Sequence, residues 1–149
     1  DFILGDAFND LSIPYHLTTR EFSSILRSIL KPDGLLIANV IDSFEKGLFL
    51  PAYVRTLEEV FGKGKIALVA DSSFVGMGIN TIIVTASVRE HPWKEVEKTS
   101  EGRCYVLVPA EINAKLNLPA AVLLTDDHAP VDNLTAPIFE ERFGKKRKG

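Results

Sequence analysis

Residues 18–41, TTREFSSILRSILKPDGLLIANVI, decide the fold because they combine a helix, a turn and a buried strand. Thr18 and Glu21 have the spacing of a capping box, in which each side chain bonds the backbone amide of the other residue. Apolar residues then recur at helical spacing, and we expect them to form one buried face: Phe22, Ile25, Leu26, Ile29 and Leu30. The turn at 31–34 contains a proline and a glycine, which end the helix. The apolar run 35–41 predicts a strand covered on both faces.

The same alternation of elements continues on both sides of this stretch. Phe2–Leu4 is a short apolar run that predicts a strand. Downstream, the pattern predicts a helix over 51–61, with an inner stripe of Leu50, Val54, Leu57 and Phe61. Residues 65–70 and 79–88 then predict two more strands, the last rich in β-branched residues. The order strand, helix, strand, helix, strand, strand predicts an α/β fold. We expect three layers around a mostly parallel sheet whose last strand is antiparallel.

The alternation of predicted strands and helices becomes less clear after residue 90. We therefore expect the chain to have three parts. Residues 1–90 form the α/β core, residues 91–144 form an irregular appendage packed on it, and residues 145–149 form a solvated basic tail. The appendage shows short extended pieces at 105–108 and 122–124. Its prolines punctuate the pattern and are typical of loops: Pro109, Pro119, Pro130 and Pro137.

The amino-acid composition disfavours several classes of function. The chain has 149 residues, of which 46% are hydrophobic and 25% are charged, as in ordinary globular domains. Its net charge is −3 despite the basic tail, which disfavours a nucleic-acid surface. The single cysteine, Cys104, excludes an internal disulfide and a cysteine zinc site and indicates a reducing, cytoplasmic location. No apolar run reaches the roughly 20 residues that a membrane span needs, so we expect no membrane contact by this segment. The chain opens on an apolar strand without methionine, which favours a fragment of a longer protein.

Carboxylates follow three of the predicted strands. Asp6, Asp42 and Asp71 fall at the carboxyl ends of strands, where ligands bind in open parallel sheets. Such carboxylates can bind a cationic amine or accept a proton from it, or they can cap the next helix or turn. We expect capping for Asp42 and Asp71. Asn39, inside the apolar strand, is either a satisfied buried amide or a group at the ligand edge, and its residue type leaves both open.

A second cluster of polar residues, at 126–132, is the weaker candidate for a metal site. Asp126, Asp127, His128 and Asp132 could be imagined as ligands for a hard metal ion. Capping of a turn and a helix beside Pro130 explains these residues better. We therefore expect no metal.

Three motifs in series resemble the spermidine synthase family, the polyamine aminopropyltransferases. They are Gly5–Asp10 (GDAFND), Leu17–Phe22 (LTTREF) and Leu30–Leu35 (LKPDGL). A fourth, Leu124–Leu134 (LTDDHAPVDNL), looks like the terminal Leu-Thr-Asp-Asp-x-x-Pro motif of bacterial spermidine-synthase-like proteins. The resemblance implies that residues 1–90 are the C-terminal half of a Rossmann-like, class I S-adenosylmethionine-dependent methyltransferase-type fold.

The resemblance also implies a chemistry. Members of the family transfer an aminopropyl group from decarboxylated S-adenosylmethionine to a small-molecule amine. By this likeness Asp6 is the catalytic base, Asp6 and Ala7 contact the cofactor, and Tyr15 borders the amine, although ordinary packing explains Tyr15 equally well. The second carboxylate of the family falls at Asn9, and an amide cannot accept a proton as a carboxylate does. Either Asp10 takes that role or the amine is not putrescine.

Two alternatives remain beside this interpretation. The glycine motif for the sulfonium and the acidic residue for the ribose are absent from the chain, so we expect the isolated chain to bind the cofactor weakly and to be inactive. The same fold would equally serve a methyltransferase that uses S-adenosylmethionine and acts on another nucleophile. A non-catalytic subunit or interaction module would associate through its exposed first strand, with the missing N-terminal half or with a second copy.

Overall fold

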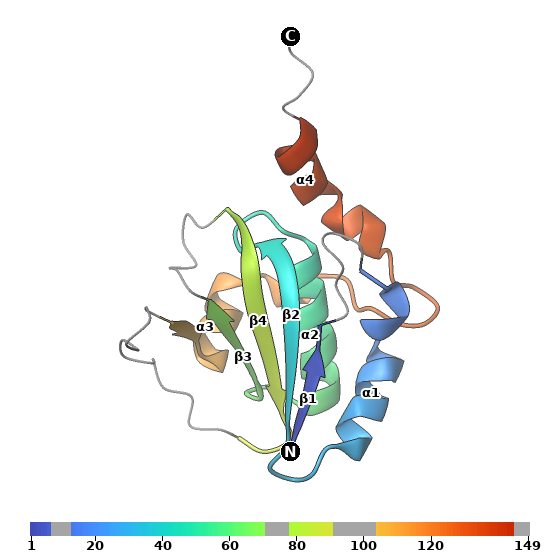
Figure 1. Ribbon diagram of the computed structural model, residues 1–149, viewed down its shortest axis with the longest axis vertical. Helices are drawn as coiled ribbons and strands as arrows, with labels where there is room; N and C mark the ends of the chain where they lie inside the picture. The colour runs from blue at the N-terminus through green and yellow to red at the C-terminus, as the bar shows by residue number, and fades with distance from the viewer. Residues whose placement is uncertain (7–12, 71–77, 91–103, 145–149) are drawn as a thin grey trace.

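The computed structural model describes residues 1–6, 13–70, 78–90 and 104–144. Figure 1 shows a twisted five-stranded sheet with helices packed beside it. The strands lie in the order β1-β2-β4-β3-β5. Their bounds are β1 (Phe2–Gly5), β2 (Leu35–Ser43), β3 (Ile66–Ala70), β4 (Ile79–Ser87) and β5 (Tyr105–Leu107). The α/β class expected from the sequence is confirmed, and all four strands expected in residues 1–90 are present.

The directions of the strands follow from how they pair. β1 and β2 pair in parallel, whereas β4 pairs antiparallel with both β2 and β3. The first three strands therefore run the same way, and β4 runs against them from a position between β2 and β3. This is the strand that the sequence predicted to be antiparallel. β5 adds antiparallel to β3, so part of the C-terminal region extends the same sheet.

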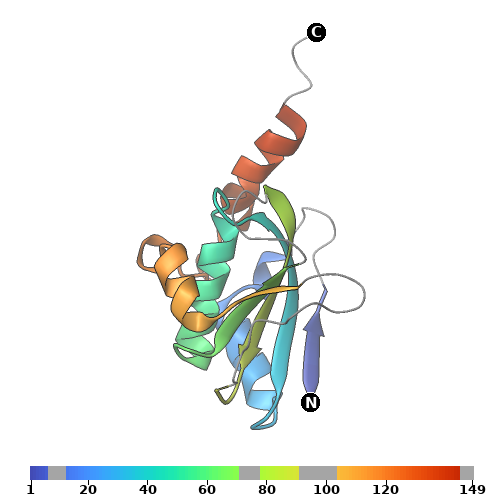
Figure 2. The ribbon, with the colours of Figure 1, turned by 90° about the vertical axis from the view of Figure 1, so that its left-hand side faces the viewer.

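The described residues form four helices: α1 (Arg20–Ile29), α2 (Phe49–Phe61), α3 (Pro109–Lys115) and α4 (Val131–Phe143), with 3-10 turns η1 (Tyr15–Leu17) and η2 (Leu118–Ala120). Figure 2 shows α1, α2 and α3 on the same side of the strands, whereas α4 extends beyond the end of the sheet. Burial along β2 agrees, because Leu36, Ala38 and Val40 are almost wholly buried while residues 35, 37, 39 and 41 are half-buried. Within the described residues, strand 35–41 is thus covered by helices on one face only. None of these helices is long and apolar enough to cross a membrane.

The beginning of α1 differs from its expected capping box. Thr19 caps the helix, because its hydroxyl accepts the amide of Phe22 at 3.2 Å. The hydroxyl of Thr18 instead donates to the carbonyl of Tyr15 at 2.7 Å. Part of the apolar face of α1 is open to solvent within the described residues, since Ile25 and Ile29 are 59% and 64% exposed.

The core lies between α2 and the sheet. The expected inner stripe of α2 is confirmed, since Leu50, Val54, Leu57 and Phe61 are all buried. Phe49 and Tyr53 add a stacked aromatic pair on the buried side, with ring centroids 5.7 Å apart. Burial of such side chains stabilises the fold by about 1.5–3 kcal/mol each.

A segment near the C-terminus fastens α1 and α2 together, and we call residues 124–126 the C-terminal clamp. The amide of Leu124 donates to the hydroxyl of Thr56 in α2 at 3.0 Å, and its carbonyl accepts the amide of Arg20 at 2.8 Å. The amide of Asp126 donates to the carboxylate of Glu21 at 3.0 Å. The Glu21 side chain, which a capping box would turn back on its own helix, is therefore bonded to a distant segment.

Candidate active site

Asp6 directly follows β1 at the carboxyl edge of the sheet. The register pairs Gly5 with Ala38, which brings Asp6 beside Asn39 of β2. The Nδ2 group of Asn39 donates to Oδ1 of Asp6 at 3.0 Å, and the Asp6 side chain is exposed. A carboxylate that is oriented by an amide and open to solvent at this edge can bind a cation or accept a proton.

A hollow of about 420 Å³ reaches Asp6 from the helix side of the sheet. It is lined mainly by apolar residues of β1, η1, α1, β2 and α2: Ile3, Leu4, Gly5, Asp6, Leu17, Phe22, Leu26, Leu36, Ala38 and Tyr53. Tyr53 is the residue here that the sequence reasoning missed, although it lies one turn from Phe49 on the inner face of α2. Burial raises the pKa of its hydroxyl, so that the phenol stays protonated.

The other residues assigned from the family resemblance are not tested by the geometry. Tyr15 begins η1, is 56% exposed, and stands edge-on to His16 with ring centroids 5.5 Å apart. It is not part of the lining of the hollow. Ala7, Asn9 and Asp10 lie outside the described residues. Their roles stay predictions.

Asp42 has the capping role that the sequence favoured. It is fully buried at the end of β2, where its two oxygens accept the amides of Ser43 at 2.8 Å and Leu50 at 2.7 Å. Burial raises the pKa of this carboxyl to about 6, although its bonds to backbone amides pull the pKa down. Gly47 packs directly against the carboxylate. Asp42 therefore fixes the start of α2, whereas Asp71 lies outside the described residues.

The cluster around His128 forms a turn. The backbones of Thr125 and His128 pair as an isolated bridge, and the Thr125 hydroxyl accepts the His128 amide at 3.2 Å. Among residues 1–6, 13–70, 78–90 and 104–144, no group of three or more histidine, cysteine or acidic side chains is placed to hold a metal ion.

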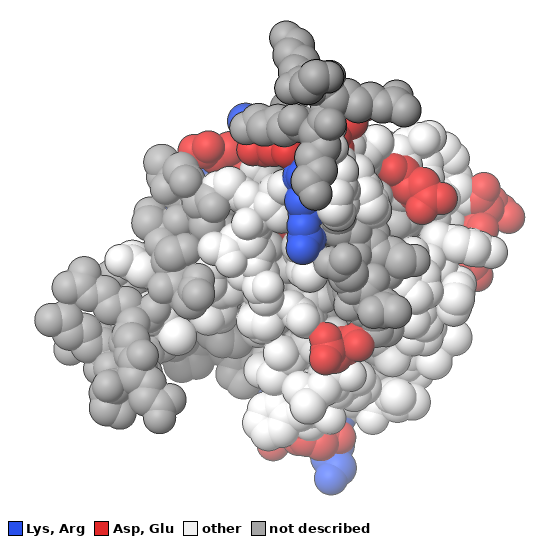
Figure 3. Space-filling view, turned by 45° about the horizontal axis from the view of Figure 1, so that its top comes forward, with Lys and Arg blue, Asp and Glu red and all other residues white. Residues whose placement is uncertain are grey.

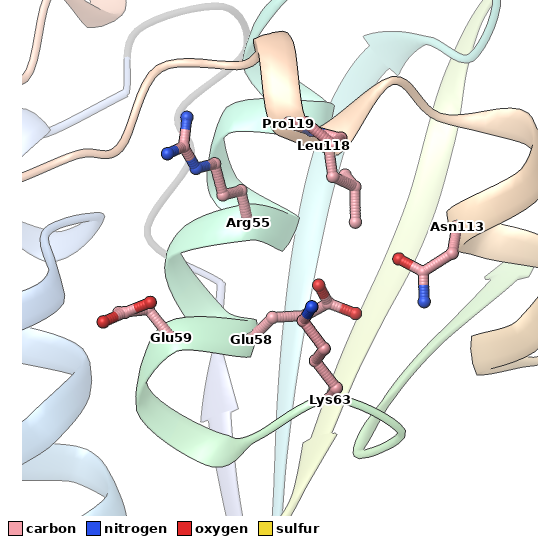
Figure 4. Close-up of a pocket in the computed structure, with 7 residues that line it drawn as sticks. All are labelled: Arg55, Glu58, Glu59, Lys63, Asn113, Leu118 and Pro119. Atoms are coloured by element: carbon pink, nitrogen blue, oxygen red, sulfur yellow. The ribbon is translucent and has the colours of Figure 1, made fainter.

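A second hollow, of about 280 Å³, lies on the outer side of α2. Figure 4 shows Glu58 and Lys63 at its centre and Asn113 of α3 across from them. Burial raises the pKa of Glu58, and the charge of Lys63 lowers it. The hollow thus combines opposite charges and lies away from the carboxyl edge, so it is the weaker candidate for a substrate site.

The charged side chains that the structure describes on the carboxyl side of the sheet are mostly acidic. Figure 3 tilts this side toward the reader and shows more acidic than basic side chains among the described residues. An acidic surface raises the local concentration of cations.

Two curated proteins are similar in sequence. A probable polyamine aminopropyl transferase of Bifidobacterium longum is 28% identical over 150 residues, which cover 90% of this chain and 34% of that protein. A polyamine aminopropyltransferase of Vibrio vulnificus is 41% identical over 63 residues, which cover 42% of this chain and 20% of that protein. The matches thus span about a third and a fifth of these relatives. No family model matches the chain.

A solved structure shares the fold. The crystal structure of a probable spermidine synthase from Corynebacterium glutamicum superposes with a TM-score of 0.69 at 21% identity, and the match covers 85% of this chain and 47% of that one. The overall fold is therefore similar to that of this probable spermidine synthase, and the sequence matches are to polyamine aminopropyltransferases. By sequence and by fold, the chain resembles proteins of the spermidine synthase family.

Proposed function

We propose that the chain is part of an aminopropyltransferase, which moves the aminopropyl group of decarboxylated S-adenosylmethionine to the nitrogen of a small amine. The observation that carries the proposal is the exposed Asp6 carboxylate at the carboxyl edge, held by Asn39 at 3.0 Å. The names of the sequence relatives support the same reaction class. The acidic character of this side favours a cationic ligand.

The role of Asp6 follows from the chemistry of amines. A primary amine is mostly protonated at neutral pH, because its pKa lies near that of a lysine, at about 10. A carboxylate first binds that cation and then removes one proton, which frees the nitrogen lone pair. The nitrogen attacks the carbon next to the sulfonium, the carbon–sulfur bond breaks, and a neutral thioether leaves with the bonding electron pair.

The remaining assignments come from the family resemblance. In this proposal Ala7 contacts the cofactor, and Asn9, Asp10 and Tyr15 border the amine. The glycine motif and the acidic residue for the ribose come from a half-domain that precedes residue 1. Residues 91–144 form the part that packs on the catalytic core.

The test uses a longer protein that contains this chain and the preceding half-domain. With decarboxylated S-adenosylmethionine and putrescine, we expect mass spectrometry to show an aminopropylated amine. With S-adenosylmethionine we expect no methylated product, whose appearance would favour a methyltransferase. The isolated chain of 149 residues serves as the control, and we expect no turnover from it. Failure of the longer protein to modify several amines with either donor would contradict an enzymatic role.

An association role is the second candidate, because β1 forms an open edge of the sheet. Within the described residues β1 pairs with β2 only. Phe2 and Leu4 are 71% and 73% exposed, and Ile25 and Ile29 of α1 add further exposed apolar area. Open strand edges invite pairing, and large apolar patches are rare on monomers. The partner in this proposal is the preceding half-domain or a second copy of the chain.

We expect the isolated chain to pair through β1 in solution. Light scattering should give more than the monomer mass, and hydrogen exchange at Phe2–Leu4 should be slow. The double variant Phe2→Lys with Leu4→Lys should be monomeric and exchange fast there. As a control, Leu48→Lys, at a residue that is 49% exposed elsewhere, should leave both readouts unchanged. A monomeric wild type with fast exchange at Phe2–Leu4 would show that the edge is open.

A further inference from the structure

We propose that Asn39 is a positioning residue for Asp6 and that its side-chain oxygen receives an N–H group of the bound amine. The inference rests on the proposed function for the role of Asp6 as base. It is carried by two observations on one side chain. Its Nδ2 group donates to Asp6, and its Oδ1 atom is buried without a hydrogen-bond partner among the residues that the structure describes.

The orientation of the Asn39 amide is dictated by its neighbour. An ionised carboxylate only accepts hydrogen bonds, so the amide must turn its NH₂ group toward Asp6. The flipped orientation would bring two oxygens to a separation of 3.0 Å. The bond to Asp6 therefore also fixes Oδ1, which cannot exchange places with Nδ2 to find a donor elsewhere.

No group among the described residues offsets the free-energy cost of burying this oxygen, and a ligand with an N–H group would offset it. A buried acceptor without a donor loses its hydration and gains nothing in return. The residues around it in β2 are apolar, and a leucine or valine at position 39 would avoid this loss. Binding of a ligand therefore explains the amide side chain of Asn39 better than packing within β2 does.

An amine fits the two acceptors together. A primary ammonium group has three N–H bonds, so it can give one to the Asp6 carboxylate and another to Oδ1 of Asn39. Two such bonds hold the nitrogen in one orientation, which aligns its lone pair once Asp6 has removed the proton. A neutral amide adds no negative charge, so it orients the amine without stabilising the ammonium form as a second carboxylate would.

The first arm of the test uses the isolated chain and needs no activity. In ¹⁵N NMR spectra, the two protons of the Asn39 NH₂ group should have well-separated shifts, and the one bonded to Asp6 should exchange slowly with water. In the variant Asp6→Ala the two shifts should converge. Shifts that are the same in wild type and Asp6→Ala would overturn the positioning role.

The second arm measures kinetics in the longer protein with putrescine as the amine. Asn39→Leu should raise KM for the amine and lower kcat, with a loss of about 10–100-fold in kcat/KM, while KM for the donor stays unchanged. Asn39→Gln should restore part of the loss, which a packing role would not predict. Asn117→Leu, at an exposed asparagine just before η2, is the matched control and should behave as wild type.

The outcomes separate this inference from the proposed function. A wild-type protein that transfers no aminopropyl group contradicts the proposed function itself. A wild type that is active, with Asn39→Leu within twofold of it, overturns the inference alone. If Asn39→Leu fails to fold by circular dichroism, Asn39→Ser replaces it, because serine keeps a polar group of smaller reach and must show the same rise in KM for the amine.

Discussion

The variant Asp6→Asn of the longer protein is expected to lose about 10²–10⁴-fold in kcat, the usual contribution of a general base. The substitution preserves shape, and the new amide oxygen still accepts the hydrogen bond from Asn39, which in the wild type is 3.0 Å long. It removes the ability to take a proton and to neutralise an ammonium group. The loss should therefore appear in single-turnover rates at saturating amine, where binding no longer limits the rate.

A matched control distinguishes the base from an ordinary surface carboxylate. Asp33 is an exposed aspartate in the turn before β2, and Asp33→Asn should keep wild-type turnover. Near-normal turnover of Asp6→Asn would mean that Asp6 only shapes the turn after β1. The family assignment of the base would then be wrong.

The variant Gly47→Ala is expected to destabilise the isolated chain by about 3 kcal/mol, the upper end of the usual range for overpacking. A methyl group at position 47 would overlap both carboxylate oxygens of Asp42. Asp42 cannot move aside cheaply, because its oxygens accept the amides of Ser43 and Leu50 inside the core. The start of α2 must shift instead. Urea titration followed by circular dichroism should show a lower midpoint with an unchanged slope.

A glycine in open space provides the control for this experiment. Gly144 caps α4 at a φ of −68°, and an added methyl group there would meet nothing within 4 Å. Gly144→Ala should therefore keep or slightly raise the free energy of unfolding. Equal midpoints for wild type and Gly47→Ala would contradict the close packing of Gly47 on Asp42.

Much of the fold follows from local signals in the sequence. The apolar run of β2 and the inner stripe of α2 are each decided by residues close together in the chain, and both were predicted. Two helices were missed because proline was taken as a breaker. Pro109 occupies the first turn of α3, where its missing N–H costs nothing, and Pro137 lies inside α4. The position of β4 between β2 and β3 depends on long-range pairing and has no local signal.

The sequence could place a candidate site residue only where its position depends on the strand that carries it and not on a distant partner. Asp6 was one of three carboxylates placed after predicted strands, and its assignment as the base comes from the family resemblance and stays a prediction. Asn39 remained undecided, because its bond to Asp6 depends on the register between β1 and β2, which joins residues 33 positions apart. The capping box failed for a similar reason. The Glu21 carboxylate bonds the amide of Asp126, 105 positions away, and no spacing near residue 21 could reveal that partner.

The C-terminal clamp has a consequence for the order in which the chain assembles. Its bonds to Thr56 and Glu21 span 68 and 105 positions, so they close large loops. On the ribosome, the start of α1 emerges more than a hundred residues before the segment that fastens it, which at about 5–20 residues per second is a delay of several seconds. During that interval α1 can contact the residues that have already emerged, which come to include α2, but it lacks the bonds of the clamp. Helix α1 is thus synthesised well before the segment that fastens it to α2.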